Sequence, residues 1–296
     1  MELRHLRYFV TVAEELHFGR AAAILHIAQP PLSQQIKALE AELGVKLFWR
    51  SSRRVELTGA GVAFLDGARR TLAEAGEAAR SARAAAGGER ATIVVGFVDS
   101  SVYSFLPDIL RAFMASHPTV RVKTRALTSA QQIDALERGD IQVGILRPAR
   151  ASSRIVVQEL GREALVVALT RGHPLTGLDR VQIKDLQGEP LVFFQRELVP
   201  SVYDLIMGMF HRAGQMPHIV QEAGEQHTLI ALVAAGIGYS ITAEGLQDWG
   251  TRDVVYRPLA HPAAWVAMNI ASKRSSHSEP VASFIDSAMA TVAARR

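Results

Sequence analysis

Apolar side chains near the start of the chain recur with the period of amphipathic helices. A first helix is predicted because they stand three and four positions apart, at Leu3, Leu6, Phe9, Val10, Ala13 and Leu16. A second apolar face follows, at Phe18, Ala21, Ala22 and Leu25. The two faces predict a pair of short helices that pack on each other and on a further element.

A third helix is predicted to begin at two consecutive prolines. Pro30 disfavours helical backbone at Gln29, whereas Pro30 and Pro31 suit a first helical turn, whose N–H groups lack intrahelical partners. An apolar stripe follows, at Leu32, Ile36, Leu39 and Leu43, and Gly44 is the expected C-cap. Helix, tight turn and helix are typical of the helix-turn-helix that reads DNA.

The polar face of this third helix carries amide, hydroxyl and ammonium groups suited to base contact. Gln can pair with adenine, Ser can contact either base type, and Lys can reach guanine or phosphate. The predicted DNA contacts at this helix are Gln29, Pro30, Pro31, Ser33, Gln34 and Lys37. An ordinary solvated helix face is the alternative, because these side chains suit water equally well.

A basic segment follows the third helix. Residues 46–54 carry four positive charges and no negative charge, and Val55-Glu56-Leu57 then alternates like a strand. This pattern predicts a two-stranded wing beside the helices, with Arg50, Arg53 and Arg54 meeting phosphates or a minor groove. A solvated turn is the alternative for so short a basic run.

The stretch from residue 59 to residue 86 is predicted to form one long helix, about 40 Å in length at 1.5 Å per residue. Thr58 can cap it, and its narrow apolar seam comprises Val62, Leu65, Leu72, Ala75 and Ala79. So narrow a seam favours pairing with a partner helix, with packing on its own domain as the alternative. Residues 84–88 are expected to end the helix as a joint.

Beyond residue 91 the pattern changes to strands that alternate with helices. Strands are predicted at residues 92–97, 120–124, 141–146, 164–169, 191–195, 219–222, 237–241 and 265–271, with helices through residue 113 and at 129–138, 201–212, 225–235 and 280–293. The opening βαβαβ order predicts a parallel sheet with helices on both faces. A second unit is expected to start near Gly161, giving two α/β lobes joined by two crossings.

Four loops between a strand and a helix are candidates for a ligand site, because open α/β sheets bind ligands at the carboxyl ends of their strands. The candidate residues are Ser100, Ser101, Thr128, Ser129, Arg147, Gln195, Pro200, Ser201, Val202 and Gln226. Free N–H groups at helix starts favour an organic anion. Plain helix capping is the alternative for each hydroxyl, and Asp99, Glu197 and Glu225 count against a strongly anionic ligand.

Composition narrows the function class. The chain has 296 residues, 48% apolar content, a net charge of +4 and no cysteine, which excludes disulfides, thiolate metal sites and cysteine nucleophiles. It shows neither a secretory segment nor an apolar run of membrane-spanning length, so a soluble cytoplasmic protein of a prokaryote is expected. The mild net charge does not by itself indicate nucleic acid.

No catalytic residue, metal site or cofactor is predicted. HExxH, GxSxG, P-loop and complete GxGxxG patterns are absent, and Gly236-Ile237-Gly238 lacks the third glycine. A hydrolytic triad assembled from distant Ser, His and Asp residues stays open on sequence alone. A solute-binding protein would need an export signal and no DNA-binding head, which is the reverse of this chain.

Residues 1–61, MELRHLRYFVTVAEELHFGRAAAILHIAQPPLSQQIKALEAELGVKLFWRSSRRVELTGAG, closely resemble the LysR-type transcriptional regulators. RGHPL at 171–175 and AAGIG at 234–238 extend the resemblance along essentially the whole chain. One departure is Gln34, which stands where many relatives have arginine.

The resemblance implies three parts: a winged helix-turn-helix at residues 1–58, a dimerising helix at 59–88, and an effector domain at 89–296 with the fold of periplasmic binding proteins. Its lobes would comprise about 89–161 with 266–296, and about 162–265. The implied partners are promoter DNA, RNA polymerase, a small organic acid or aromatic catabolite, and further copies of the chain as a dimer or tetramer. The family pattern would place Gln29, Pro30, Ser33, Gln34 and Arg53 against DNA.

Overall fold

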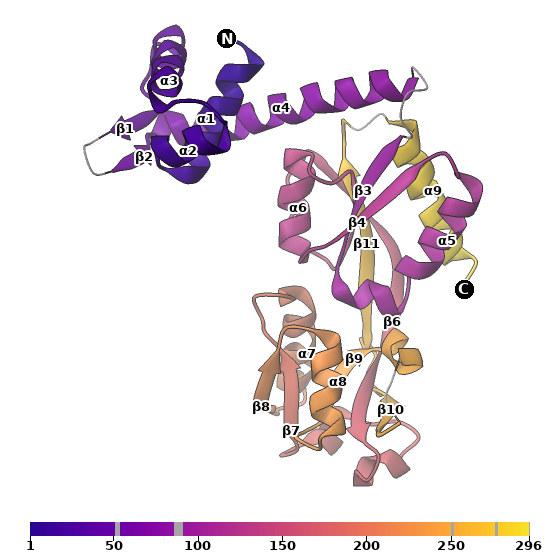
Figure 1. Cartoon of the computed structure of the whole chain (residues 1–296). Coiled ribbons are helices and arrows are strands. Elements are labelled where there is room, and N and C mark those ends of the chain that lie inside the picture. Colours follow the sequence, from indigo (N-terminus) through magenta and orange to yellow (C-terminus); the bar gives the residue numbers. More distant parts are fainter. Residues whose placement is uncertain (51–53, 86–90, 250–251, 276–277, 296) are drawn as a thin grey trace. The chain divides into compact units, whose positions relative to one another are not determined.

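A computed structural model describes residues 1–50, 54–85, 91–249, 252–275 and 278–295 (Figure 1). The chain separates into two compact units, residues 1–89 and residues 90–296. We call the first the DNA-binding unit and the second the effector unit, following the sequence expectations. Each is described by itself.

The DNA-binding unit has the predicted helices and wing. Its elements are α1 (Leu3–Glu15), α2 (Phe18–Ile24), α3 (Gln29–Leu43), β1 (Phe48–Arg50), β2 (Val55–Leu57) and α4 (Gly59–Ala85). β1 and β2 pair antiparallel, with Phe48 opposite Leu57. The core forms around Phe9, whose ring lies 5.3 Å from the ring of Phe48 and 5.1 Å from that of Phe64. Aromatic contacts of this kind join α1 to the wing and to α4.

Two local features end and begin the helices as predicted. Gly44 follows α3 with φ of 70°, a left-handed conformation that glycine adopts without strain. Thr58 caps α4, because its Oγ1 accepts a hydrogen bond from the Gly61 N–H at 2.9 Å. A Cβ atom on Gly61 would lie 2.1 Å from the Leu47 carbonyl oxygen, so only glycine lets α4 approach the wing this closely. The predicted joint at residues 86–88 lies outside the described residues.

The effector unit contains two large hydrophobic cores, and we call the part around each of them a lobe. Lobe I contains β3 (Thr92–Phe97), η1 (Asp99–Tyr103), α5 (Leu106–Ser116), β4 (Arg121–Ala126), α6 (Ser129–Arg138), β5 (Val143–Leu146) and α9 (Glu279–Ala293). Lobe II contains η2 (Pro174–Gly177), η3 (Ile183–Leu186), β7 (Pro190–Phe194), α7 (Pro200–Arg212), β8 (His218–Ala223), α8 (Gln226–Ala234), β9 (Ser240–Ala243), η4 (Glu244–Trp249) and β10 (Val254–Pro258). The long strands β6 (Ile155–Thr170) and β11 (Trp265–Lys273) run from one lobe to the other (Figure 1). A smaller third cluster lies among β6, α8, η4 and β10.

The sheet order is β10-β6-β11-β5-β3-β4, with β9 also paired to β6. β3 is parallel to β4 and β5, as predicted for the βαβαβ segment. Beyond that segment the pairing is mixed: β6 pairs antiparallel with β9, β10 and β11, while β7 and β8 pair parallel in a separate two-stranded sheet. The sequence pattern also missed β10.

Strand β6 runs through Gly161, where the second unit is expected to start, so the strand predicted at residues 164–169 is longer than expected at its N-terminal end. A Cβ atom on Gly161 would lie 2.8 Å from a methyl carbon of Val292 and 3.1 Å from the ring of Phe105. This glycine therefore makes room for close packing on the strand instead of ending it. The register of β6 against β11 shifts between Met268 and Asn269, which leaves Leu160 as an extra residue in β6.

Two adjacent residues of α5 provide a test of how much the lobe I core contributes to the free energy of unfolding. Phe113 is fully buried, with its ring 5.0 Å from that of Phe284 in α9, whereas Met114 is 51% exposed. We expect Phe113→Ala to lower the free energy of unfolding by about 3–5 kcal/mol and Met114→Ala to change it by less than about 0.5 kcal/mol. Urea denaturation of the full chain tests this, and equal losses in both variants would contradict the packing.

Candidate DNA interface and effector site

The outward face of α3 carries the predicted DNA contacts. Gln29, Pro30, Pro31, Gln34 and Lys37 are exposed. Ser33 is half-buried, while Leu32, Ile36 and Leu39 are fully buried on the other side of α3. The described part of the chain offers no hydrogen-bond partner to the polar side chains of this face. They are free to bond to another molecule.

A buried carboxylate fixes the wing against α3. Glu40 is only 3% exposed. Its Oε1 accepts hydrogen bonds from the backbone N–H groups of Leu47 at 3.0 Å and Phe48 at 3.2 Å. Its Oε2 lies 3.0 Å from Nη2 of Arg50 and 3.5 Å from Nζ of Lys46. One carboxylate of the predicted recognition helix thus sets where the wing begins.

The three predicted wing arginines differ in their surroundings. The guanidinium of Arg50 bonds Glu40 and lies 4.9 Å from the centre of the Phe18 ring, which gives it a part in positioning the wing, and its contact with phosphate stays a prediction. The side chain of Arg54 is 78% exposed and pairs with Glu56 at 2.8 Å, a contact that leaves it accessible. Arg53 lies outside the described residues, and its role stays a prediction.

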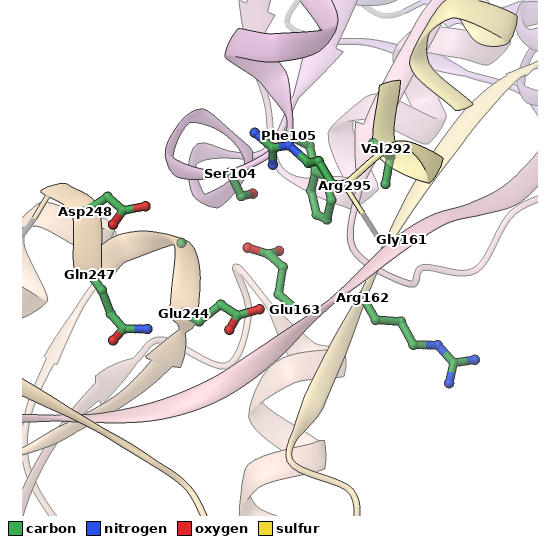
Figure 2. Close-up of a pocket in the computed structure, with 11 residues that line it drawn as sticks. Ser104, Phe105, Gly161, Arg162, Glu163, Glu244, Gln247, Asp248, Val292 and Arg295 are labelled. Atoms are coloured by element: carbon green, nitrogen blue, oxygen red, sulfur yellow. The ribbon is translucent and has the colours of Figure 1, made fainter. Parts of the chain in front are cut away.

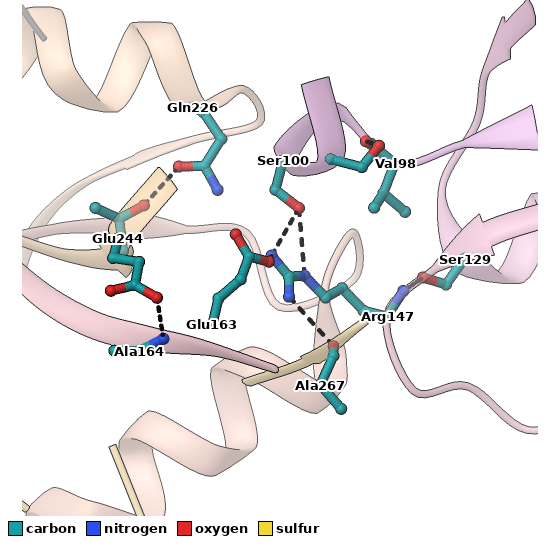
Figure 3. A network of polar contacts seen from close by, with 11 residues as sticks. Val98, Ser100, Ser129, Arg147, Glu163, Ala164, Gln226, Glu244 and Ala267 are labelled. Atoms are coloured by element: carbon teal, nitrogen blue, oxygen red, sulfur yellow. Dashed lines mark hydrogen bonds and ion pairs between the residues drawn. The ribbon is translucent and has the colours of Figure 1, made fainter. Parts of the chain in front are cut away.

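In the effector unit, Arg147 forms hydrogen bonds and an ion pair with residues from several elements (Figure 3). The residue is 3% exposed, and its Nε and Nη2 donate to Ser100 Oγ at 3.3 and 3.1 Å. Nη1 donates to the Ala267 carbonyl at 3.2 Å, and Nη2 lies 2.7 Å from Glu163 Oε2. The backbone N–H of Arg147 donates to Ser129 Oγ at 3.1 Å. Two of the predicted ligand hydroxyls therefore converge on it.

Two other predicted hydroxyls take structural roles. Ser101 is fully buried and donates from Oγ to the Val98 carbonyl at 2.7 Å. Thr128 Oγ1 accepts the Gln131 N–H at 3.3 Å and caps α6. For both residues the structure supports the capping alternative over direct ligand contact.

Gln226 joins lobe II to this cluster. Its backbone N–H, at the start of α8, donates to Asp99 Oδ2 in lobe I at 3.3 Å. Its side-chain Oε1 accepts from Thr242 Oγ1 at 2.9 Å (Figure 3). The pKa of nearby Tyr103 is raised above its usual value, first by burial and then by the carboxylates of Asp99 and Glu225. The surroundings of Gln226 thus already hold negative charge.

The remaining four candidates lie around the start of α7. Gln195 is exposed and accepts the Leu198 N–H at its carbonyl, at 3.1 Å. Pro200 opens α7, Ser201 is half-buried, and Val202 packs against the lobe II core. Within the described residues, none of the four bonds to the Arg147 cluster.

Two important residues escaped the sequence reasoning. Glu163 is buried in β6 and pairs with Arg147, and Thr242, 2% exposed in β9, orients Gln226. Glu163 had a recognisable signal, because it stands two positions before the buried run Leu165–Leu169. A carboxylate beside a buried strand needs a cationic partner.

Comparison with known proteins adds to this geometry. Residues 3–62 match the model of the bacterial regulatory helix-turn-helix protein, lysR family, and residues 86–293 match that of the LysR substrate binding domain. The chain belongs to the LysR family of transcriptional regulators. It is therefore a DNA-binding regulator with an effector-binding domain, and not an enzyme.

Relatives of the LysR family match the chain over most of its length. The HTH-type transcriptional regulator AlsR of Bacillus subtilis is 41% identical over 288 residues, which cover 96% of this chain and 94% of AlsR. Full-length CbnR in complex with its target DNA is 32% identical, with a TM-score of 0.62, covering 99% of this chain and 100% of that one. The effector-binding domain of BenM with its effector benzoate is 27% identical, with a TM-score of 0.65, covering 70% and 94%.

The described helices of this LysR-family chain include none that is both long and apolar enough to cross a membrane.

The buried carboxylate of α3 makes a testable prediction. Glu40→Gln keeps an acceptor for the Leu47 and Phe48 amides but removes the charge that holds Arg50. We expect these two amides to lose about 1 kcal/mol of protection, because a neutral acceptor bonds an N–H less strongly than a charged one. Native-state hydrogen exchange measures it.

Glu42→Gln is the matched control for Glu40→Gln, because its side chain on the same helix is 49% exposed. Equal protection of Leu47 and Phe48 in both variants would show that Glu40 does not position the wing.

Proposed function

We propose that this LysR-type regulator binds operator DNA through α3 and the wing as a homodimer, and responds to a small organic acid bound near Ser100, Ser129 and Gln226. The observation that carries the first part is the exposed, unpartnered polar face of α3. The observation that carries the second is the convergence of hydroxyl groups, an arginine and a helix start where lobes I and II meet.

For DNA, the chemistry of the α3 face supports direct reading of bases. Gln34 can pair bidentately with adenine, and Lys37 can reach guanine or phosphate. Arg54 supplies charge beside this face for the phosphate backbone. The solved complex of CbnR with its target DNA supports the same partner for this chain.

For assembly, α4 supplies the argument. It spans 27 residues, about 40 Å, and Val62 of its predicted seam is 60% exposed while Leu65 and Leu72 are half-buried. Leu65 and Leu72 pack against the core of their own unit, so it is the exposed position at Val62 on so long a helix that favours a partner helix. A homodimer would present two α3 helices to a two-part operator, and we extend the proposal to pairs of dimers and to contact with RNA polymerase.

For the effector, the charges around Arg147 favour a monoanion. Glu163 already neutralises the guanidinium, and Asp99 and Glu225 add negative charge near Gln226. A single carboxylate could accept from Ser100 and from the N–H groups at the start of α8, whereas a second carboxylate would meet repulsion. Benzoate, the effector in the BenM structure, is a monoanion of this class.

Regulation then requires that the effector bind two arrangements of the lobes with different affinity. The contact between Asp99 and Gln226 joins the lobes directly, so a ligand that competes with it would change their spacing. We propose that this change reaches the DNA-binding unit through α4 and alters DNA bending.

Footprinting of the full-length protein on sheared genomic DNA of its host, with and without a panel of aromatic and aliphatic monocarboxylates, tests the proposed function. Enrichment at a small set of promoters, with a footprint that changes with one acid, is the expected result. Absence of any enriched site would contradict the operator-binding proposal. Footprints that no acid alters would contradict the effector proposal.

Two variants separate base reading from backbone binding. Gln34→Ala should relax base preference at one operator position, because it removes a bidentate amide worth about 1–3 kcal/mol of discrimination. Arg54→Ala should weaken binding to all duplexes about equally and reduce the slope of log affinity against log salt by about one. Affinity measured on an operator and on its single-base variants, over a salt series, compares them. Equal loss of discrimination in both variants would refute this division.

Ser100→Ala tests the effector site. Removing the hydroxyl should weaken the responding monocarboxylate about five- to tenfold, the loss of one hydrogen bond of roughly 1 kcal/mol. Ser116→Ala, in the exposed last turn of α5, is the control and should bind as the unchanged protein does. Calorimetric titration of the full-length protein gives both values, and unchanged affinity in Ser100→Ala would remove Ser100 from the site.

A further inference from the structure

A cavity of about 420 Å³ lies beside β6 and involves none of the ten predicted effector residues (Figure 2). It is lined by β6, by η4, by the end of η1 and by the end of α9. The lining residues used below are Ser104, Phe105, Glu163, Glu244, Asp248 and Val292. Its size falls within the usual range of pockets for small ligands.

Two buried polar atoms of this cavity have no partner. Glu163 Oε1 and Ser104 Oγ are buried, and neither forms a hydrogen bond within the described chain. The Glu163 side chain is 4% exposed, and Figure 2 shows it directed toward Ser104 and Phe105. Buried polar atoms in folded proteins are ordinarily hydrogen-bonded. The carboxylate oxygen can only accept, so the missing group is a donor.

The charge of the cavity is negative. Glu244 accepts a backbone hydrogen bond from Ala164 at 3.1 Å, and neither it nor Asp248 forms an ion pair with a described residue. Buried Glu163 adds a third carboxylate, with one oxygen paired to Arg147. A ligand that supplies positive charge would meet carboxylates at the mouth and on the wall.

The two arginines at the cavity do not cancel this charge. Arg162 bonds Glu159 at 2.8 and 3.2 Å, its guanidinium lies 3.9 Å from the centre of the Trp265 ring, and Figure 2 shows it turned away. Arg295 pairs with Asp108. Both guanidinium groups are already engaged by carboxylates of their own.

We propose that this cavity binds a small aliphatic ammonium ion. Its N–H groups would donate to Glu163 Oε1 and Ser104 Oγ, with Glu244 and Asp248 supplying long-range attraction at the mouth. Phe105 and Val292 provide an apolar wall for a short carbon chain, and the face of the Phe105 ring is already taken by the Arg295 guanidinium, 5.8 Å from the ring centre. The regulator would then have a second ligand site, opposite in charge preference to the one proposed for an organic acid.

Calorimetric titration of the full-length protein with n-butylamine and with butyrate, at constant ionic strength, tests the proposal. The two probes share a carbon skeleton and differ in charge. We expect n-butylamine to bind, and the double variant Glu244→Gln/Asp248→Asn to weaken it at least tenfold, about 1.4 kcal/mol. Both positions are exposed, so the fold should survive, and circular dichroism checks this.

The control is Glu279→Gln/Asp286→Asn, which removes two exposed carboxylates of α9 that do not line the cavity. It should bind n-butylamine as the unchanged protein does. The proposal would be overturned if n-butylamine did not bind, or if both double variants weakened its binding equally. It would also be overturned if Glu244→Gln/Asp248→Asn weakened the binding of butyrate but not that of n-butylamine.

Discussion

The effector unit depends on a single buried ion pair. Arg147 stands at the carboxyl end of β5; its guanidinium bonds η1, β11 and β6, and its backbone N–H bonds Ser129 at the start of α6. Its partner Glu163 lies on the strand that runs between the lobes. Removing one member of such a pair leaves an uncompensated buried charge, typically at a cost of about 3–5 kcal/mol. This pair therefore fixes where the lobes meet.

The DNA-binding unit also uses a buried carboxylate and an arginine to hold its elements together. Its wing is too short to hold itself in place, and Glu40 supplies the bonds that a longer sheet would provide. Arg50 then links that carboxylate to the aromatic core through Phe18. In both units a buried carboxylate and an arginine set the relation between elements that pack weakly on their own, which is a specifying role more than a source of net stability.

Sequence reasoning succeeded where one local rule decides the structure. Helix α3, the Gly44 cap and the Thr58 cap follow from proline, glycine and hydroxyl chemistry within a few residues. It missed the first half of β6, where Gly161 is accommodated by contacts with Phe105 and Val292 from distant parts of the chain.

In the candidate sites too, the sequence predicted the features that depend on nearby residues and missed those that depend on distant ones. Helix starts predicted Ser100, Ser129 and Gln226 as a group, but the partners that determine their roles are Glu163, Asp99 and Thr242. Those pairings join positions that are far apart in the sequence, so the periodicity of apolar residues cannot predict them. This is also why the pairing of the Arg50 guanidinium with Glu40 could not be read from the basic segment alone.

Strand geometry explains how one effector unit can contain two sites of opposite charge preference. Successive side chains of a strand point to opposite faces, so Arg162 and Glu163 of β6 cannot neutralise each other. Arg162 turns to Glu159 and Trp265, while Glu163 shares one oxygen with Arg147 and presents the other to the cavity. The surroundings of Ser100 thus contain a guanidinium, and the cavity contains only the carboxylate side of the same ion pair. Both sites contact the one Glu163 side chain and so lie on the same face of β6, and a ligand's charge decides which member of the ion pair it can approach.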